Sequence, residues 1–170
     1  SQLEDQQARC HLCAHRCLIA PGRKGVCLVR ENREGVLYSL VYGRPISQAV
    51  DPIEKKPLFH FFPGSRSFSI ATMGCNFRCT YCQNADISQM PRSQRVIAAP
   101  YVSPEEVVRA AQQAGCRSIA YTYTEPTIFF EYGYDIARLA YAEGIANVYV
   151  TNGYMTAEML DLFQGVGHSH

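Results

Sequence analysis

The stretch that decides the fold and the chemistry is Cys75-Asn76-Phe77-Arg78-Cys79-Thr80-Tyr81-Cys82-Gln83-Asn84. Its three cysteines are spaced C-x3-C-x2-C, and no fourth cysteine lies close by. Iron–sulfur clusters are held by cysteine thiolates, normally four. Three ligands on a four-iron cube leave one iron open, and an open position is where a metal site does chemistry. The alternative is a zinc knuckle or a redox-sensitive loop, although zinc usually takes four ligands.

Length and composition indicate a globular chain without a strongly charged partner. With 170 residues, it is long enough for one ordinary domain and a small appendage. A net charge of +1 gives no reason to expect a nucleic-acid partner. We find no apolar run long enough for a membrane span and no signal peptide. Eight cysteines without an export signal predict metal ligation in a reducing, cytoplasmic setting.

A second group of cysteines lies near the start of the chain, with the spacing C-x2-C-x3-C-x9-C: Cys10, Cys13, Cys17 and Cys27. Four soft ligands in a segment punctuated by glycine and proline predict a metal-stapled loop. Zinc and a second iron–sulfur cluster both fit these ligands. The alternative is four ordinary buried cysteines. His11 and His15 are interleaved, but four thiolates already complete a tetrahedron, so we do not expect them to be ligands.

The next segment predicts two short strands and then an irregular stretch. Residues 25–30 and 36–42 are expected to pair as a hairpin through a polar link that contains a glycine. Residues 44–64 contain four prolines, which favours an ordered but irregular crossing segment. We expect its aromatic side chains to pack on the following domain. Lys55 and Lys56 are expected to be solvated.

The rest of the chain alternates strands and helices, which predicts a parallel sheet with right-handed crossovers. We expect strands at 67–73, 118–122 and 147–150, and helices at 103–115, 127–143 and 157–163. About twenty residues after the cysteine loop are expected to be irregular. The first strand delivers the cysteine loop at its carboxyl end, where α/β barrels place their chemistry. Glu125 follows the second strand, at a place where a carboxylate can contact a ligand. The alternative is that its carboxylate only faces the dipole of the next helix.

The cysteine loop resembles that of the radical S-adenosylmethionine (SAM) enzymes, whose pattern is C-x3-C-x-aromatic-C. Tyr81 fills the aromatic position, and Asn84 is typical of the activating-enzyme branch. The resemblance implies a 4Fe–4S cluster on Cys75, Cys79 and Cys82. It also implies that SAM is cleaved reductively to a 5′-deoxyadenosyl radical, which abstracts hydrogen from a substrate. The cofactors carry that chemistry, and the protein positions them.

The chain departs from the pattern of that family at two places, before Glu125 and before Thr151. Glycine or another small residue usually precedes the glutamate after the second strand, whereas this chain has Tyr123 and Thr124 before Glu125. The Thr-Asn-Gly turn at 151–153 also resembles the activating-enzyme branch, but Val150 replaces its usual aspartate. At the positions that match, the resemblance implies a SAM site made of Tyr81, Asn84, Thr124, Glu125, Thr151 and Asn152.

Further motifs make the resemblance narrower. The first cysteine group, Asp51-Pro52-Ile53-Glu54-Lys55-Lys56-Pro57-Leu58 and Tyr121-Thr122-Tyr123-Thr124-Glu125-Pro126-Thr127 resemble the AmmeMemoRadiSam-system radical SAM enzymes, relatives of pyruvate formate-lyase activating enzyme. The resemblance implies an oxidoreductase with an electron donor such as flavodoxin or ferredoxin, and a protein is one option for its substrate. The resemblance ends near Gln164, and the chain ends Gly-Val-Gly-His-Ser-His, so we expect it to be truncated.

These inferences give an α/β fold class. Residues 1–64 are expected to form a cysteine-rich, metal-stapled hairpin segment with an irregular linker. Residues 65–170 are expected to form the first three β/α units of an open, partial TIM barrel. The hypothesis from another class is a zinc-stabilised structural or binding module without redox chemistry, in which both cysteine groups are structural.

Overall fold

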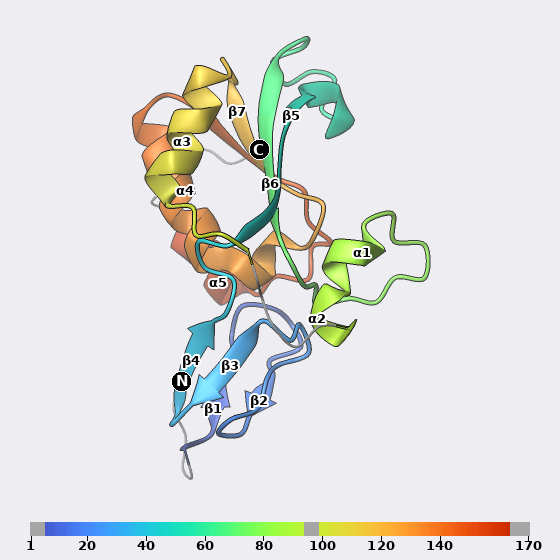
Figure 1. The fold of residues 1–170 in the computed structure, drawn as a ribbon, viewed down its shortest axis with the longest axis vertical. Coiled ribbons are helices and arrows are strands. Elements are labelled where there is room, and N and C mark those ends of the chain that lie inside the picture. The colour runs from blue at the N-terminus through green and yellow to red at the C-terminus, as the bar shows by residue number, and fades with distance from the viewer. Residues whose placement is uncertain (1–5, 94–98, 164–170) are drawn as a thin grey trace.

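The computed structural model describes residues 6–93 and 99–163. Its main feature is a four-stranded sheet in the order β5-β6-β7-β8, made of β5 (Pro45–Pro52), β6 (Arg66–Thr72), β7 (Ser118–Tyr121) and β8 (Ala146–Tyr149). Strands β6, β7 and β8 run parallel, and β5 pairs antiparallel with β6 (Figure 1). The three predicted strands are confirmed with small shifts at their ends.

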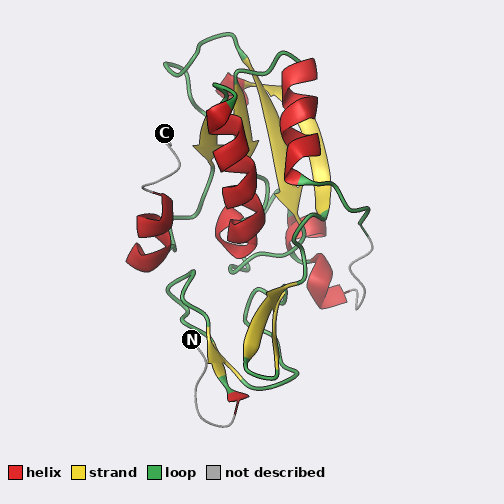
Figure 2. Cartoon of the chain, turned by 90° about the vertical axis from the view of Figure 1, so that its left-hand side faces the viewer, coloured by secondary structure: helices red, strands yellow, loops and turns green. Residues whose placement is uncertain are grey.

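One face of the sheet packs against two helices. Helices α3 (Pro104–Gln113) and α4 (Phe130–Ala142) both cover this face (Figure 2), and the 3-10 helix η3 (Pro126–Phe129) leads into α4. Ser103 begins α3 with a capping box, in which its hydroxyl accepts from the Glu106 N–H and the Glu106 side chain accepts from the Ser103 N–H. Alternate strand residues point to the helices and form the main core, among them Phe68, Ile70, Ile119 and Tyr121.

The opposite face of the sheet carries smaller side chains and a second apolar cluster. Ile53, in the 3-10 helix η2 (Ile53–Lys55), is buried with Ala120 and Val148, and Leu58 and Phe61 pack against them. The expected packing of the aromatic residues is therefore confirmed for Phe61, whereas Phe59 is exposed.

The prediction that residues 44–64 form an irregular segment is wrong for β5. Pro45 and Pro52 lie at the two ends of this strand, and a proline at an end of an edge strand does not disrupt the ladder. The region after the cysteine loop is also more regular than expected, since it contains α1 (Ala85–Ser88) and α2 (Met90–Ser93). Part of that predicted irregular region, residues 94–98, lies outside the described residues.

The amino-terminal part forms two small antiparallel pairs at one end of the molecule (Figure 1). They are β1 (Ala8–Arg9) with β2 (Leu18–Ile19), and β3 (Arg30–Arg33) with β4 (Val36–Ser39). Strand β3 covers residues 30–33, largely where we expected the polar link, and the prediction of a strand at residues 25–30 is wrong. The turn between β3 and β4 therefore consists of Glu34 and Gly35, both with positive φ. Arg30 is buried and donates to both carboxylate oxygens of Glu131, at 2.7 and 2.5 Å, which ties this part to α4.

The last described helix is α5 (Ala157–Phe163), as predicted, and the Thr156 hydroxyl accepts a hydrogen bond from the Met159 N–H at 3.2 Å. Within the described part of the chain, no helix has the length and apolar character needed to cross a membrane.

Candidate functional site

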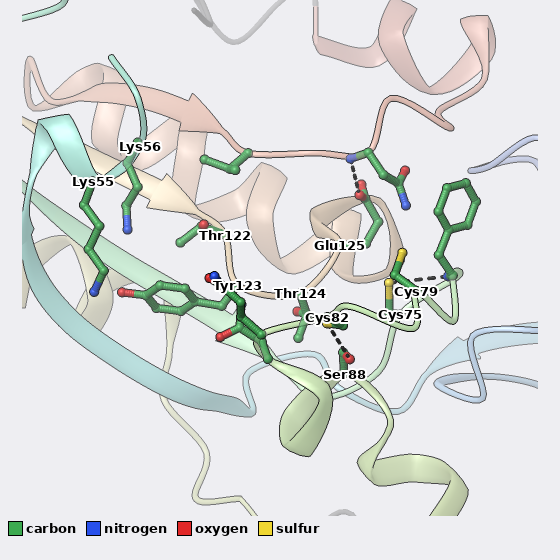
Figure 3. A pocket seen from close by; sticks show the side chains of 15 residues that line it. Lys55, Lys56, Cys75, Cys79, Cys82, Ser88, Thr122, Tyr123, Thr124 and Glu125 are labelled. Carbon is green, nitrogen blue, oxygen red and sulfur yellow. Dashed lines mark hydrogen bonds between the residues drawn. The ribbon is translucent and has the colours of Figure 1, made fainter. Parts of the chain in front are cut away.

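A cavity of about 440 Å³ opens at the carboxyl ends of β6, β7 and β8 (Figure 3). Its wall includes seven of the nine residues predicted for the cluster and SAM: Cys75, Cys79, Cys82, Asn84, Thr124, Glu125 and Asn152. These residues come from three separate loops, and the parallel strands bring them together. Tyr81 and Thr151 do not line it.

Gly74 determines how the cysteine loop leaves β6. Its φ is +96°, in the left-handed region that favours glycine. A Cβ at this position would lie 2.7 Å from Val29 Cγ1 and 3.2 Å from the carbonyl oxygen of Cys27. The chain can therefore make this close turn over the amino-terminal part only with glycine, and the turn directs Cys75 into the cavity.

The three thiols have different surroundings. Cys79 is exposed, while Cys75 is partly buried, and burial raises the pKa of its thiol despite a hydrogen bond from the Phe77 N–H at 3.4 Å. The sulfur of Cys82 lies 3.5 Å from the Ser88 hydroxyl. Metals bind the thiolate form, so a metal bound here displaces the thiol protons.

The chemistry of the thiols indicates which kind of group they suit. Among residues 6–93 and 99–163, no three His, Cys, Asp or Glu side chains are placed to hold a metal ion. Cys75, Cys79 and Cys82 nevertheless share the wall of one large cavity. Three thiols are a soft donor set, and iron–sulfur clusters are held by donors of this kind.

Glu125 is a buried carboxylate that accepts four hydrogen bonds at this edge of the sheet. It is only 3% exposed. Its Oε1 accepts from the Thr127 N–H at 3.1 Å, the Thr127 hydroxyl at 2.5 Å and the Thr151 hydroxyl at 2.7 Å. Its Oε2 accepts from the Asn152 N–H at 2.8 Å. Glu125 therefore begins the short helix η3, as the alternative interpretation had it, and also faces the cavity.

The remaining predicted SAM residues are placed differently. Thr151 lies behind Glu125 and reaches the cavity only through it. Tyr81 is 86% exposed, and its direct contact with SAM stays a prediction. Thr124 donates to the Thr72 carbonyl at 2.8 Å, which holds the loop after β7 to the end of β6.

The sequence analysis missed a charged group on the same cavity wall. Lys56 is 5% exposed, so the expectation that it is solvated is wrong, whereas Lys55 is half exposed. Both donate to the buried carboxylate of Asp51 at 2.8 Å. Tyr123 also donates to Asp51, and its φ of +65° lies in the left-handed region. The spacing of Asp51 four and five residues before the two lysines was the available signal.

The four amino-terminal cysteines also line a shared cavity, a small one of about 20 Å³. Burial raises the pKa of Cys10, and it raises the pKa of Cys27 to about 11. We did not expect His15 to be a metal ligand, and its ring is engaged elsewhere. Its Nε2 lies 3.0 Å from the Asn76 carbonyl, and its ring packs on Phe77 and Tyr154. A metal at these four cysteines stays a prediction.

The site defines a class of protein: an α/β chain that gathers three thiols in a cavity at the carboxyl ends of parallel strands, as suits an enzyme with a bound cluster. Residues 69–170 match the family model of the Radical SAM superfamily, and the chain belongs to that superfamily.

Curated relatives agree with this family. The chain is 48% identical to the uncharacterized protein MJ0808 of Methanocaldococcus jannaschii over 161 residues, which are 94% of this chain and 47% of that protein. It is 29% identical to the GTP 3',8-cyclase of Actinobacillus pleuropneumoniae serotype 3 over 126 residues, 72% of this chain and 34% of the cyclase. The chain thus spans about half the length of MJ0808, and about a third of the cyclase. Membership in the superfamily implies a 4Fe–4S cluster, SAM and a reductant, and it does not favour the zinc-module hypothesis.

Proposed function

We propose that this chain supplies the cluster-binding and SAM-binding half of a radical SAM enzyme. In this proposal Cys75, Cys79 and Cys82 hold a 4Fe–4S cluster with one open iron. The supporting observation is that these three thiols and Glu125 line one cavity of about 440 Å³ at the ends of three parallel strands. A zinc module would need no such cavity beside its ligands.

The bound cluster and SAM would supply an electron and a carbon radical for hydrogen abstraction from a substrate, and an electron donor such as flavodoxin or ferredoxin would reduce the cluster. The protein's own residues bind and orient SAM. Glu125 Oε1 already accepts three hydrogen bonds, whereas its Oε2 accepts one. Because each carboxylate oxygen has about two acceptor positions, Oε2 is the atom that can take the SAM ammonium group.

The arrangement of the other predicted residues supports the same placement. Asn84, Thr124 and Asn152 share the cavity with the cysteines and Glu125, so SAM bound at the open iron would reach them. Thr151 would act by holding Glu125 through its hydroxyl. Tyr81 would have to turn from its exposed position to touch SAM.

The substrate of the whole protein has two candidates. The motifs that resemble activating enzymes favour a protein substrate, on which hydrogen abstraction would leave a glycyl radical. The similarity to proteins named GTP 3',8-cyclase favours a nucleotide instead. Incubation of the reduced, cluster-loaded protein with SAM and GTP, with mass spectrometry of the nucleotide, separates them: conversion of GTP supports the nucleotide, and unchanged GTP leaves the activating-enzyme candidate.

The domain organisation follows from the same proposal. Residues 65–170 would form the first half of an open, partial TIM barrel, with residues 1–64 as a cysteine-rich segment that holds zinc or a second cluster. The parallel order of β6, β7 and β8, with helices on one face, is the geometry that a barrel of this kind requires. A cytoplasmic location would keep the thiols reduced.

The test is anaerobic reconstitution with iron and sulfide, reduction, and electron paramagnetic resonance (EPR) with and without SAM. We expect a reduced 4Fe–4S signal that changes shape when SAM is added. Cys79→Ala should abolish it. Cys116→Ala is the matched control, because Cys116 is buried in the main core away from the cavity. A SAM-responsive cluster in Cys79→Ala, or zinc in place of the cluster in the wild-type protein, would contradict the assignment.

A further inference from the structure

We propose that Lys55 and Lys56 form a binding site for an anionic group of the substrate, a carboxylate or a phosphate. This proposal rests on the proposed function, because it takes the cysteine end of the same cavity as the place of the cluster. Lys55 and Lys56 line that cavity together with the three cysteines. Figure 3 shows the two lysines at one end and Cys75 and Cys79 at the other, with Tyr123 and Thr122 between them.

The first argument is burial. The side chain of Lys56 is 2% exposed, although lysine is almost never buried without a partner. Its partner is Asp51, whose side chain is 8% exposed. Burying an ammonium group is costly, and the pairing with Asp51 holds this charge in place where Lys56 also lines the cavity.

The second argument is the charge balance. Asp51 accepts hydrogen bonds from Lys55, Lys56, Ser69 and Tyr123. Two ammonium groups therefore share one carboxylate, and one positive charge is left over. Each ammonium group has three N–H donors, and its bond to Asp51 uses one of them.

Glu125 is the carboxylate among the described residues that line the cavity, and it does not cancel this charge. Glu125 belongs to the cysteine end, where the Thr127, Thr151 and Asn152 donors already hold it. An incoming anion would supply the missing negative charge and accept from the remaining lysine N–H groups.

The third argument is the backbone of Tyr123. This residue has a φ of +65°, which is unfavourable for a side chain with a Cβ. Its hydroxyl donates to Asp51, and its ring centroid lies 4.6 Å from the Lys56 ammonium and 5.5 Å from that of Lys55. Strained residues persist where surrounding contacts hold them, and they concentrate at ligand sites. Tyr123 thus fixes both lysines at the cavity.

The chain offers a direct probe, because it contains only three lysines, Lys24, Lys55 and Lys56. Lys24 is exposed in the amino-terminal part and does not line this cavity. We would label lysine with ¹³C at Cε, assign the three signals with Lys24→Gln, Lys55→Gln and Lys56→Gln, and titrate the cluster-free protein with inorganic pyrophosphate at constant ionic strength.

We expect the Lys55 and Lys56 signals to shift with one saturable curve while the Lys24 signal stays in place. Lys55→Gln should weaken binding by about fivefold or more, because it removes one charge-assisted donor. Lys24→Gln should bind as the wild type does. If Lys56→Gln does not fold, Lys55→Gln still decides, since Lys55 is half exposed. Shifts that are equal for all three lysines, or no shifts, would overturn the proposal.

A second arm separates the substrate from SAM, which also carries a carboxylate. The cluster-loaded protein, saturated with pyrophosphate, is titrated with SAM and then with decarboxylated SAM. If the anion belongs to the substrate, neither compound reverses the lysine shifts. If SAM reverses them and decarboxylated SAM does not, the lysines hold the SAM carboxylate and the proposal is wrong. EPR of the same sample tests the proposed function separately, because the pyrophosphate titration needs no cluster.

Discussion

The side-chain amide of Asn152 donates a 2.9 Å hydrogen bond to Oδ1 of Asn76. It joins the loop after β8 to the cysteine loop after β6. The backbone N–H of Asn152 also donates to Glu125, in the loop after β7, at 2.8 Å. One residue therefore holds together the three loops that form the cavity. Asn76 is 2% exposed, and its backbone carbonyl lies 3.0 Å from Nε2 of His15. The junction of Asn152, Asn76 and Glu125 therefore also contacts the amino-terminal part.

Replacing Asn152 with alanine should loosen the cysteine loop. We expect the free energy of unfolding to fall by about 1–2 kcal/mol, because the buried Oδ1 of Asn76 keeps only the weak Cys75 thiol donor at 3.7 Å. The cluster should remain, and its EPR response to SAM should weaken. Urea unfolding and EPR of the reconstituted protein measure the two effects.

Asn84→Ala is the control for stability, since Asn84 lines the same cavity but makes no side-chain cap bond to α1. Its free energy of unfolding should stay within about 0.5 kcal/mol of the wild type. Equal stability of Asn152→Ala and Asn84→Ala would show that the junction contributes nothing.

Glu125→Gln should lower the free energy of unfolding, although the two side chains have nearly the same size and shape. In the glutamine side chain, an NH2 group would replace one of the two carboxylate oxygens. If it replaces Oε1, it faces the donors of Thr127 and Thr151; if it replaces Oε2, it faces the Asn152 N–H. Two donors cannot bond to each other, so we expect a loss of about 2–3 kcal/mol in the free energy of unfolding.

The same variant should keep the cluster and bind SAM more weakly, which isothermal titration measures. Glu34→Gln is the matched control, because Glu34 is exposed in the β3–β4 turn and should tolerate the change. Unchanged SAM affinity in a folded Glu125→Gln protein would remove Glu125 from the SAM site.

Asp51 should make stability depend on pH in the acid range. Burial acts to raise its pKa, but hydrogen bonds from Lys55, Lys56, Tyr123 and Ser69 outweigh burial and hold the pKa well below its usual range. A lowered pKa in the folded state gives stability that is present above the unfolded pKa, near 3.9, and is lost as pH falls below it.

Asp51→Asn should therefore lose about 2–4 kcal/mol of the free energy of unfolding at pH 7, where two ammonium groups lose their carboxylate. The difference from the wild type should shrink as the pH is lowered below about 4. Urea unfolding from pH 3 to pH 7 tests both statements. A difference that is independent of pH would mean that Asp51 acts through shape and not through charge.

Strands β6, β7 and β8, helices α3, α4 and α5 and the cysteine loop were predictable because each depends on local signals. Ser103-Pro104-Glu105-Glu106 fixes the start of α3, and hydrophobic runs mark β6, β7 and β8. Strand β5 was not predictable from the four prolines of residues 44–64, because edge strands tolerate proline at their ends, where Pro45 and Pro52 lie. The spacing of Asp51 and Lys56 could indicate an ion pair, but it could not indicate the burial of Lys56, which also depends on Tyr123 after β7.

The amino-terminal cysteines give the last prediction. Cys10, Cys13, Cys17 and Cys27 share one small cavity, and the backbone N–H of Cys10 donates to the Cys17 carbonyl at 3.0 Å, which brings the two ends of this loop together. If these residues hold a structural metal, the variant that lacks Cys75, Cys79 and Cys82 should still bind about one equivalent of zinc, or the iron of one cluster, after reconstitution.

Removing that metal should unfold the amino-terminal part, because its two-stranded sheets have little core of their own. Elemental analysis gives the metal content, and thermal unfolding with and without a chelator gives its effect on stability. Adding Cys27→Ala to the triple variant should abolish metal binding, whereas adding Cys116→Ala should not. A triple variant that binds no metal and melts at the same temperature in chelator would show that these four residues are ordinary buried thiols. The amino-terminal part would then be held by the Arg30–Glu131 ion pair and by the contacts of His15 with Phe77 and Tyr154.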